Sequence, residues 1–142
     1  MKKKIIILFL VMLTVSASTV PVLANSSGLS KGESLISPMF TYIFRAEAEL
    51  YINSSGKATV ETYVTGNSEV TSAKATIRLQ QYKNGSWTTI KTWNESSGSR
   101  ILNFSSTYYV PKGYYYRVQS TVTVYSGQKS ESTTLTSSSQ IY

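Results

Sequence analysis

The chain has 142 residues, with 14 Lys and Arg against seven acidic residues, all of them Glu, and it contains no His, Cys or Asp. This composition excludes Ser-His-Asp and Cys-His catalysis, disulfide bonds, and imidazole or thiolate zinc sites. We therefore expect no cofactor and no resident metal. The basic residues form no cluster outside the first four positions, so a nucleic-acid partner is not expected either.

The N-terminus has the pattern of a secretory signal peptide. Lys2, Lys3 and Lys4 precede an apolar run over residues 5–13, which is too short to span a membrane, and a Val-Leu-Ala end closes the segment. The sequence predicts cleavage after Ala24, so that residues 1–24 are the signal peptide and the product is secreted, extracellular and not stably inserted in a membrane. Residues 25–39 are rich in Ser and Gly and are predicted to be a flexible leader.

The first predicted hairpin starts the folded domain, expected over residues 40–142. Apolar and polar residues alternate from Tyr42 to Ile52, and Ser54-Ser55-Gly56 fits a three-residue hairpin loop. That loop places Ile52 opposite Ala58 and Glu49 opposite Glu61. The apolar faces of the two strands then coincide, which supports the pairing.

The second predicted hairpin has an Asn84-Gly85 turn, a strong signal for a two-residue connection. The turn places Tyr82 opposite Trp87 and Leu79 opposite Ile90. In this register Ile90 joins the core, whereas Trp87, Lys91 and Trp93 point outward beside Arg78 and Tyr82. Residues 94–100 are predicted to be a polar loop, and a short strand with Leu102 and Phe104 inward follows.

A strand from Tyr115 to Tyr125 gives the clearest signal in the chain. Tyr116, Val118, Val122 and Val124 share one face, while Tyr115 and Arg117 lie on the other. With a last strand near residues 130–136, about seven short strands and no helical period predict an antiparallel β-sandwich. Gly113 followed by Tyr116 suggests the tyrosine corner of immunoglobulin-like sandwiches.

Several spaced motifs cover most of the chain after the signal peptide: Phe40-Thr41-Tyr42-Ile43, Gly56-Lys57-Ala58, Leu79-Gln80-Gln81, Gly85-Ser86-Trp87 with Trp93, Gly113-Tyr114-Tyr115-Tyr116-Arg117-Val118 and Glu131-Ser132. Together they resemble a group of small secreted domains from low-GC Gram-positive bacteria. The resemblance implies a secreted bacterial protein with an all-β fold. It carries no catalytic or ligand-binding residues, because that group has no assigned activity.

The outward aromatic and basic residues are the candidate binding site: Arg78, Tyr82, Trp87, Lys91, Trp93, Tyr115 and Arg117. Aromatic rings stack on sugar rings, and neighbouring cations meet phosphate or carboxylate groups. Without the signal lysines, eleven Lys and Arg face seven Glu, a surplus that suits an anionic polymer. We expect a non-catalytic module that binds a cell-wall polysaccharide, an anionic envelope polymer or a protein. The competing interpretation is that these aromatics only pack within strands.

Two other functions stay open. Glu49 opposite Glu61 would suit a small glycan hydrolase or a weak calcium site, although a solvated pair eased by Arg45 or Lys57 is the ordinary interpretation. A chain rich in Thr, Tyr and Val with few charges per strand is also compatible with a self-associating protein of a surface layer or matrix. The oligomeric state is not determined by the sequence.

Overall fold

The computed structural model describes residues 40–142, all of which fold as β-strands and connections. The predicted signal peptide and leader, residues 1–24 and 25–39, lie outside the described residues. The strands are β1 (Ile43–Ile52), β2 (Lys57–Gly66), β3 (Ser72–Lys83), β4 (Ser86–Ser97), β5 (Ile101–Tyr109), β6 (Tyr115–Ser126), β7 (Lys129–Thr136) and β8 (Gln140–Ile141). The strands extend into residues 94–97 and 107–109, beyond the expected limits, and β8 forms within the Ser-rich tail.

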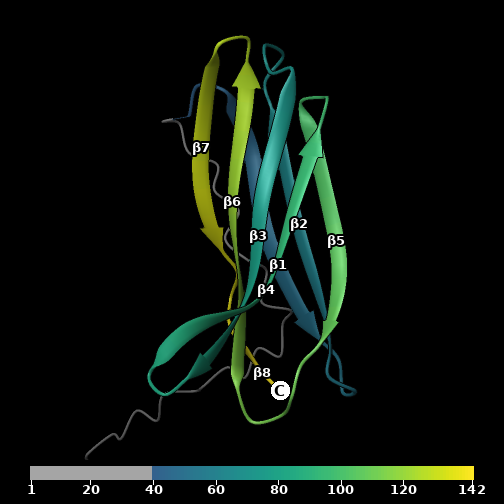
Figure 1. Ribbon diagram of the computed structural model, residues 1–142. Helices are drawn as coiled ribbons and strands as arrows, with labels where there is room; N and C mark the ends of the chain where they lie inside the picture. The colour runs from purple at the N-terminus through teal and green to yellow at the C-terminus, as the bar shows by residue number, and fades with distance from the viewer. Residues whose placement is uncertain (1–39) are drawn as a thin grey trace, which may run out of the picture.

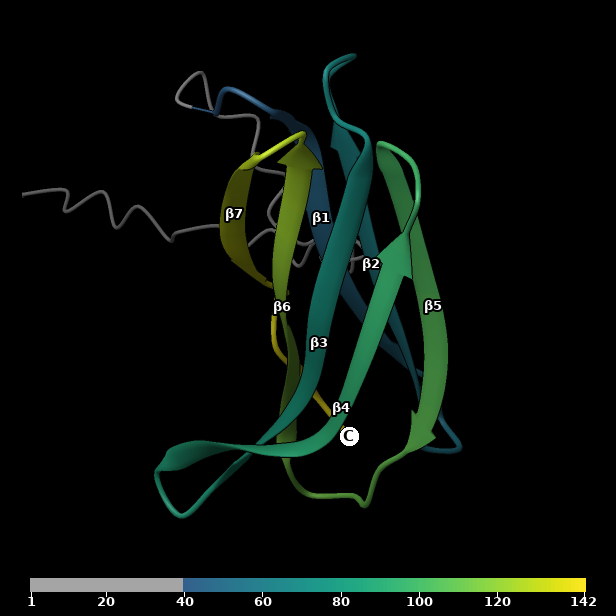
Figure 2. The same cartoon turned by 45° about the horizontal axis from the view of Figure 1, so that its top comes forward.

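The strands form two antiparallel sheets that face each other (Figure 1 and Figure 2). One sheet has the order β1-β2-β5 and the other β4-β3-β6-β7, with β8 pairing to β6. The pairs β2–β5 and β3–β6 join strands that are not consecutive in the chain, as in the sheets of immunoglobulin-like sandwiches. The predicted β-sandwich is therefore confirmed.

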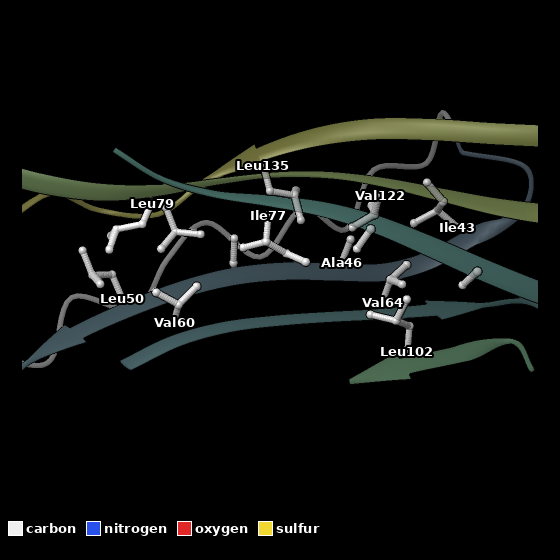
Figure 3. Close-up of a cluster of buried hydrophobic side chains, with 14 of the residues drawn as sticks. Ile43, Ala46, Leu50, Val60, Val64, Ile77, Leu79, Leu102, Val122 and Leu135 are labelled. Carbon is white, nitrogen blue, oxygen red and sulfur yellow. The ribbon is translucent and has the colours of Figure 1, made fainter. Parts of the chain in front are cut away.

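The core lies between the sheets and is built from alternate residues of each strand (Figure 3). Val60 from one sheet and Ile77, Leu79 and Val122 from the other are completely buried. Burial of one such aliphatic side chain contributes about 1.5 to 3 kcal/mol. Because the residues in between point away from the core, each sheet has a second face that is available for function.

The two hairpins meet the sequence predictions differently. Glu49 pairs with Glu61 in the β1–β2 hairpin, as expected. In the β3–β4 hairpin Tyr82 pairs with Trp87, as expected, but a β-bulge at Ile90 shifts the register, so that Leu79 lies opposite Lys91. The predicted pairing of Leu79 with Ile90 is wrong, although Ile90 still packs partly buried against the core. An extra residue in one strand reverses the face of every residue beyond it.

A buried tyrosine fixes the start of β6. The Tyr116 hydroxyl donates a hydrogen bond to the carbonyl oxygen of Pro111 at 2.7 Å and accepts one from Gln81 Nε2 at 2.9 Å. Desolvation raises the pKa of this phenol above its ordinary value, although the bond from Gln81 opposes that change. The bond back to Pro111 is the predicted tyrosine corner. It holds the first residues of β6, where Tyr115 and Arg117 lie.

Side chains of the other sheet cap the outer edge of β1. The Glu131 carboxylate accepts hydrogen bonds from the backbone amides of Thr41, Tyr42 and Ile43 at 2.7 to 2.8 Å. At the far end of β1, the Gln140 side-chain amide bonds the backbone of Leu50 and Ile52. Desolvation raises the pKa of Glu131, but the hydrogen bonds from the three amides together lower it by more. The pKa therefore lies below its ordinary value.

Replacement of Glu131 by Gln should lower the free energy of unfolding by about 1 to 2 kcal/mol, because the charged acceptor of the three amides is lost. The lowered pKa means that the carboxylate stabilises the fold above its unfolded pKa and that this contribution disappears as the pH falls through the folded pKa. Urea unfolding at pH 7 and at pH 3 measures both effects, and the difference between variant and wild type should shrink at pH 3. Glu95→Gln, at an exposed position on β4, is the control. A difference that is the same at both pH values would contradict the assignment.

Candidate functional site

A row of three aromatic side chains crosses the outer face of the larger sheet. Trp87 on β4 pairs with Tyr82 on β3, and Tyr82 pairs with Tyr115 on β6. The rings of Tyr82 and Trp87 are tilted, with their centroids 5.2 Å apart. Tyr82 is 40% exposed and Tyr115 is 48% exposed. The row lies at the turn end of the β3–β4 hairpin, which projects from the body of the sandwich in both views (Figure 1 and Figure 2).

An arginine lies directly beside this row. The guanidinium of Arg117 is 4.2 Å from the centroid of the Trp87 ring, and its Nε donates a hydrogen bond to Gln80 Oε1 at 2.8 Å. Gln80 is only 8% exposed and pairs with Arg117 across the strands. Stacking and one hydrogen bond therefore hold the plane of the guanidinium. The two terminal nitrogens have no hydrogen-bond acceptor within residues 40–142, so they remain available as a fork of donors.

We call the residues Gln80, Tyr82, Trp87, Tyr115 and Arg117 the aromatic face. Arg117 covers one side of the Trp87 ring, so Tyr82 and Tyr115 are the rings with the most accessible surface. Arg78 lies on the same side of the sheet, opposite Gln119 and therefore further along the strands. It is a neighbour of the aromatic face and makes none of the contacts described above.

Lys91 and Trp93 do not belong to the aromatic face, which corrects the sequence prediction. Past the bulge at Ile90, Trp93 pairs with the buried Ile77 and packs against the core, with its ring centroid 5.7 Å from that of Phe104. Lys91 follows Trp93 to this side, with its Nζ 5.8 Å from the indole. The two indoles therefore have different environments, since Trp93 closes the seam between the sheets and Trp87 lies on the outer face.

Gln80 is the member of the aromatic face that the sequence did not identify as a candidate. Its outward direction follows from the strand alternation, but its contact with Arg117 depends on the pairing of β3 with β6. No turn connects these two strands, so the local sequence carries no signal for their register. Only the assembled sheet places the Gln80 amide against the guanidinium.

The opposite outer face, on β1-β2-β5, carries the paired carboxylates. Glu49 and Glu61 line a shallow hollow of about 330 Å³ that also includes Glu47, Tyr63 and Asn103. Glu47 forms an ion pair with Arg45 at 2.5 Å. Within residues 40–142 no group of three or more acidic, His or Cys side chains is arranged to hold a metal ion. The sequence predicts the carboxylate pair but no cleft, so the hollow is seen only in the structure.

Neutralising one carboxylate of this pair should stabilise the protein, because like charges directly opposite each other on a sheet repel. We expect Glu61→Gln to raise the free energy of unfolding by up to about 1 kcal/mol at neutral pH and low salt, with a smaller gain at high salt. Chemical denaturation at two salt concentrations measures the change, and Glu69→Gln, in the exposed β2–β3 connection, is the control. A loss of stability in Glu61→Gln would contradict this expectation, because it would show that favourable interactions of the Glu61 carboxylate outweigh its repulsion by Glu49.

Comparison with known proteins supplies no function for the aromatic face or for the hollow beside Glu61. The chain matches no protein-family model, no curated protein and no solved structure. The structure of residues 40–142 contains no helix of the length and hydrophobicity needed to cross a membrane. The site therefore has to be interpreted from its own chemistry.

Proposed function

We propose that this protein is a secreted, non-catalytic binding module that holds an anionic polymer of the bacterial cell envelope on its aromatic face. The observation that carries the proposal is the exposed pair Tyr82 and Tyr115 beside the oriented guanidinium of Arg117. A provenance in Gram-positive bacteria, which the sequence motifs suggest, belongs to the same proposal.

The rings supply the apolar part of the proposed contact. Neighbouring strands lie about 4.8 Å apart, so a row over three strands extends for roughly 10 Å. A platform of this kind suits the flat faces of consecutive sugar rings, and the tyrosine hydroxyls add hydrogen bonding at the edge. Because the rings project from paired strands, little ordering of the protein is needed on binding.

Arg117 supplies the charged part. Its two terminal nitrogens can bind both oxygens of a phosphate or carboxylate in a bidentate manner, while Gln80 and Trp87 keep the guanidinium in position. The positive charge of the chain favours the approach of any such polymer. A neutral polysaccharide would use the rings alone and leave the fork without a partner.

The absence of His, Cys and Asp supports a non-catalytic role. The carboxylate pair Glu49 and Glu61, with its hollow, supports a glycan hydrolase as the second candidate. Release of reducing sugar from wall glycan that disappears in Glu49→Gln would favour the hydrolase. Retained polymer without release of sugar favours the binding module.

The test of the anionic contact compares Arg117→Lys with Arg78→Lys in sedimentation binding to purified Gram-positive cell walls. Lysine keeps the charge but loses both the fork and the stacked plane, so we expect Arg117→Lys to bind about tenfold more weakly. Arg78→Lys, on the same sheet but outside the aromatic face, should bind within about twofold of wild type.

The same walls stripped of their phosphodiester-linked polymers distinguish the two possible anions. A phosphate ligand predicts that the difference between wild type and Arg117→Lys disappears on stripped walls, whereas a carboxylate ligand predicts that it persists. If Arg117→Lys binds intact walls as tightly as wild type, the proposed role of the guanidinium is wrong.

A further inference from the structure

Strand β5 is one of the two edge strands of the smaller sheet, the other being β1. It pairs with β2 on one side, and no strand of residues 40–142 pairs with its other side. In both views β5 forms the outer margin of the sandwich (Figure 1 and Figure 2). A row of unpaired backbone groups in such a place is a template for another strand.

The hydrogen bonds at the two ends of β5 show which backbone groups point outward. The amide of Gly66 donates to Arg100 O, and the amide of Val110 donates to Gly56 O. The backbone N–H and C=O groups of even-numbered residues in β5 therefore point toward β2. Odd-numbered residues of β5 face away from it. The first of them, Ile101, has both backbone groups occupied by the Ser99 hydroxyl. Within the part of the chain that the structure describes, the outward backbone groups without a partner are therefore those of residues 103, 105, 107 and 109.

The other sheet edges carry the devices that block strand addition. Side chains of Glu131 and Gln140 occupy the two ends of the β1 edge. On β4 a bulge interrupts the edge and Lys91 and Glu95 are exposed, and β7 begins with the exposed Lys129. Such bulges and charges discourage edge-to-edge pairing. By contrast, β5 has no charged residue, no Pro and no Gly.

We propose that β5 pairs antiparallel with β5 of a second copy of this chain, which joins the two smaller sheets into one six-stranded sheet. Two copies of one strand pair about a two-fold axis. In the register that uses all four free residues, this axis lies between Ser106 and Ser106 of the second copy. It places residue 103 opposite residue 109 of the second copy, and residue 105 opposite residue 107. The backbone groups of these four residues then all find partners across the interface.

The side chains agree with this register. On the inner side, the partly buried Phe104 would lie opposite Tyr108, an aromatic pair across the strands. On the outer side, Tyr109, which is 69% exposed, would pack beside Asn103 of the second copy. Since β5 carries no charge, the two copies bring no like charges together within the strand pair. Self-pairing therefore covers exposed tyrosine surface and places no like charges opposite each other within β5.

The dimer would also orient the aromatic faces. The two-fold axis of an antiparallel strand pair is perpendicular to the sheet, so the larger sheets of both copies lie on the same side of the six-stranded sheet. If the proposed polymer binding is correct, one polymer could engage both copies with increased avidity. The dimer itself does not depend on that function, and its test needs no polymer.

The test uses two matched double variants at the exposed positions Ser105 and Thr107, studied by sedimentation velocity from micromolar to millimolar concentration. Wild type should show a concentration-dependent dimer. Ser105→Lys with Thr107→Lys puts lysines opposite each other twice and should weaken the dimer about tenfold or more. Ser105→Lys with Thr107→Glu puts opposite charges in the same places and should restore or strengthen it. Gln128→Lys with Ser130→Lys, on the exposed β6–β7 hairpin, should leave it unchanged.

Amide hydrogen exchange supplies an independent measurement on the wild type. Amides of residues 103, 105, 107 and 109 should become protected as the protein concentration rises, whereas outward amides of β4 should not. Thermal unfolding of each variant verifies that it is folded. A wild type that is monomeric throughout overturns the proposal, and so does a dimer that is equally strong in both charge variants. In the first case, a strand of another protein becomes the remaining occupant for β5.

Discussion

Combined replacement of Tyr82 and Tyr115 by Ala should weaken binding to intact Gram-positive cell walls by about a hundredfold. The two exposed rings are the accessible apolar surface of the aromatic face. An anchoring tyrosine at the centre of a contact contributes about 1 to 2 kcal/mol, and each 1.4 kcal/mol is a factor of ten in affinity. The expected loss exceeds that of Arg117→Lys, because the lysine variant keeps its charge and the rings.

The matched control replaces Tyr51 and Tyr109, two exposed tyrosines of the smaller sheet, by Ala. This pair is more exposed than Tyr82 and Tyr115 and removes the same amount of ring, but it lies outside the aromatic face. Its wall binding should remain close to wild type when measured at a concentration at which the chain is monomeric. Equal losses of wall affinity in both double variants would mean that exposed tyrosines bind the wall nonspecifically, which contradicts a defined binding face.

Tyr116→Phe should lower the free energy of unfolding by about 2 to 3 kcal/mol. The substitution removes only the hydroxyl, so the core keeps its shape while the carbonyl of Pro111 and the amide of Gln81 lose a partner. Buried polar groups without partners cost about 1 to 3 kcal/mol each. Urea unfolding measures the difference, and Tyr109→Phe, at an exposed tyrosine, should change stability by less than about 0.5 kcal/mol.

The pH dependence of this variant gives a second measurement. Because burial raises the pKa of Tyr116 above its ordinary value of 10.0, the folded state favours the neutral phenol. Its contribution to stability is complete below the unfolded pKa and disappears as the pH rises through the folded pKa. Stability of wild type should therefore fall more steeply than that of Tyr116→Phe above about pH 10. Parallel curves would contradict the assigned role of burial.

The sequence predicts the outward side chains of the aromatic face correctly and the position of Trp93 incorrectly. Outward Tyr82, Trp87 and Tyr115 could be predicted, because each lies close to a turn or in a strand with an unbroken alternation. Regular pairing counted from the Asn84-Gly85 turn predicts the wrong face for Trp93, because the bulge at Ile90 adds one residue to β4. A bulge depends on packing against the rest of the sheet, so local pattern does not reveal it.

The sequence by itself determined the all-β sandwich, the two local hairpins at their turns, and the exclusion of His, Cys and Asp chemistry. These properties depend on composition, on the period of two, and on turn residues that act over a few positions. Tertiary structure decided the contact of Gln80 with Arg117, the hollow beside Glu61 and the unprotected edge of β5. These three depend on which distant strands become neighbours. Strand neighbours are determined by burial of the whole core, and no single stretch of the chain specifies them.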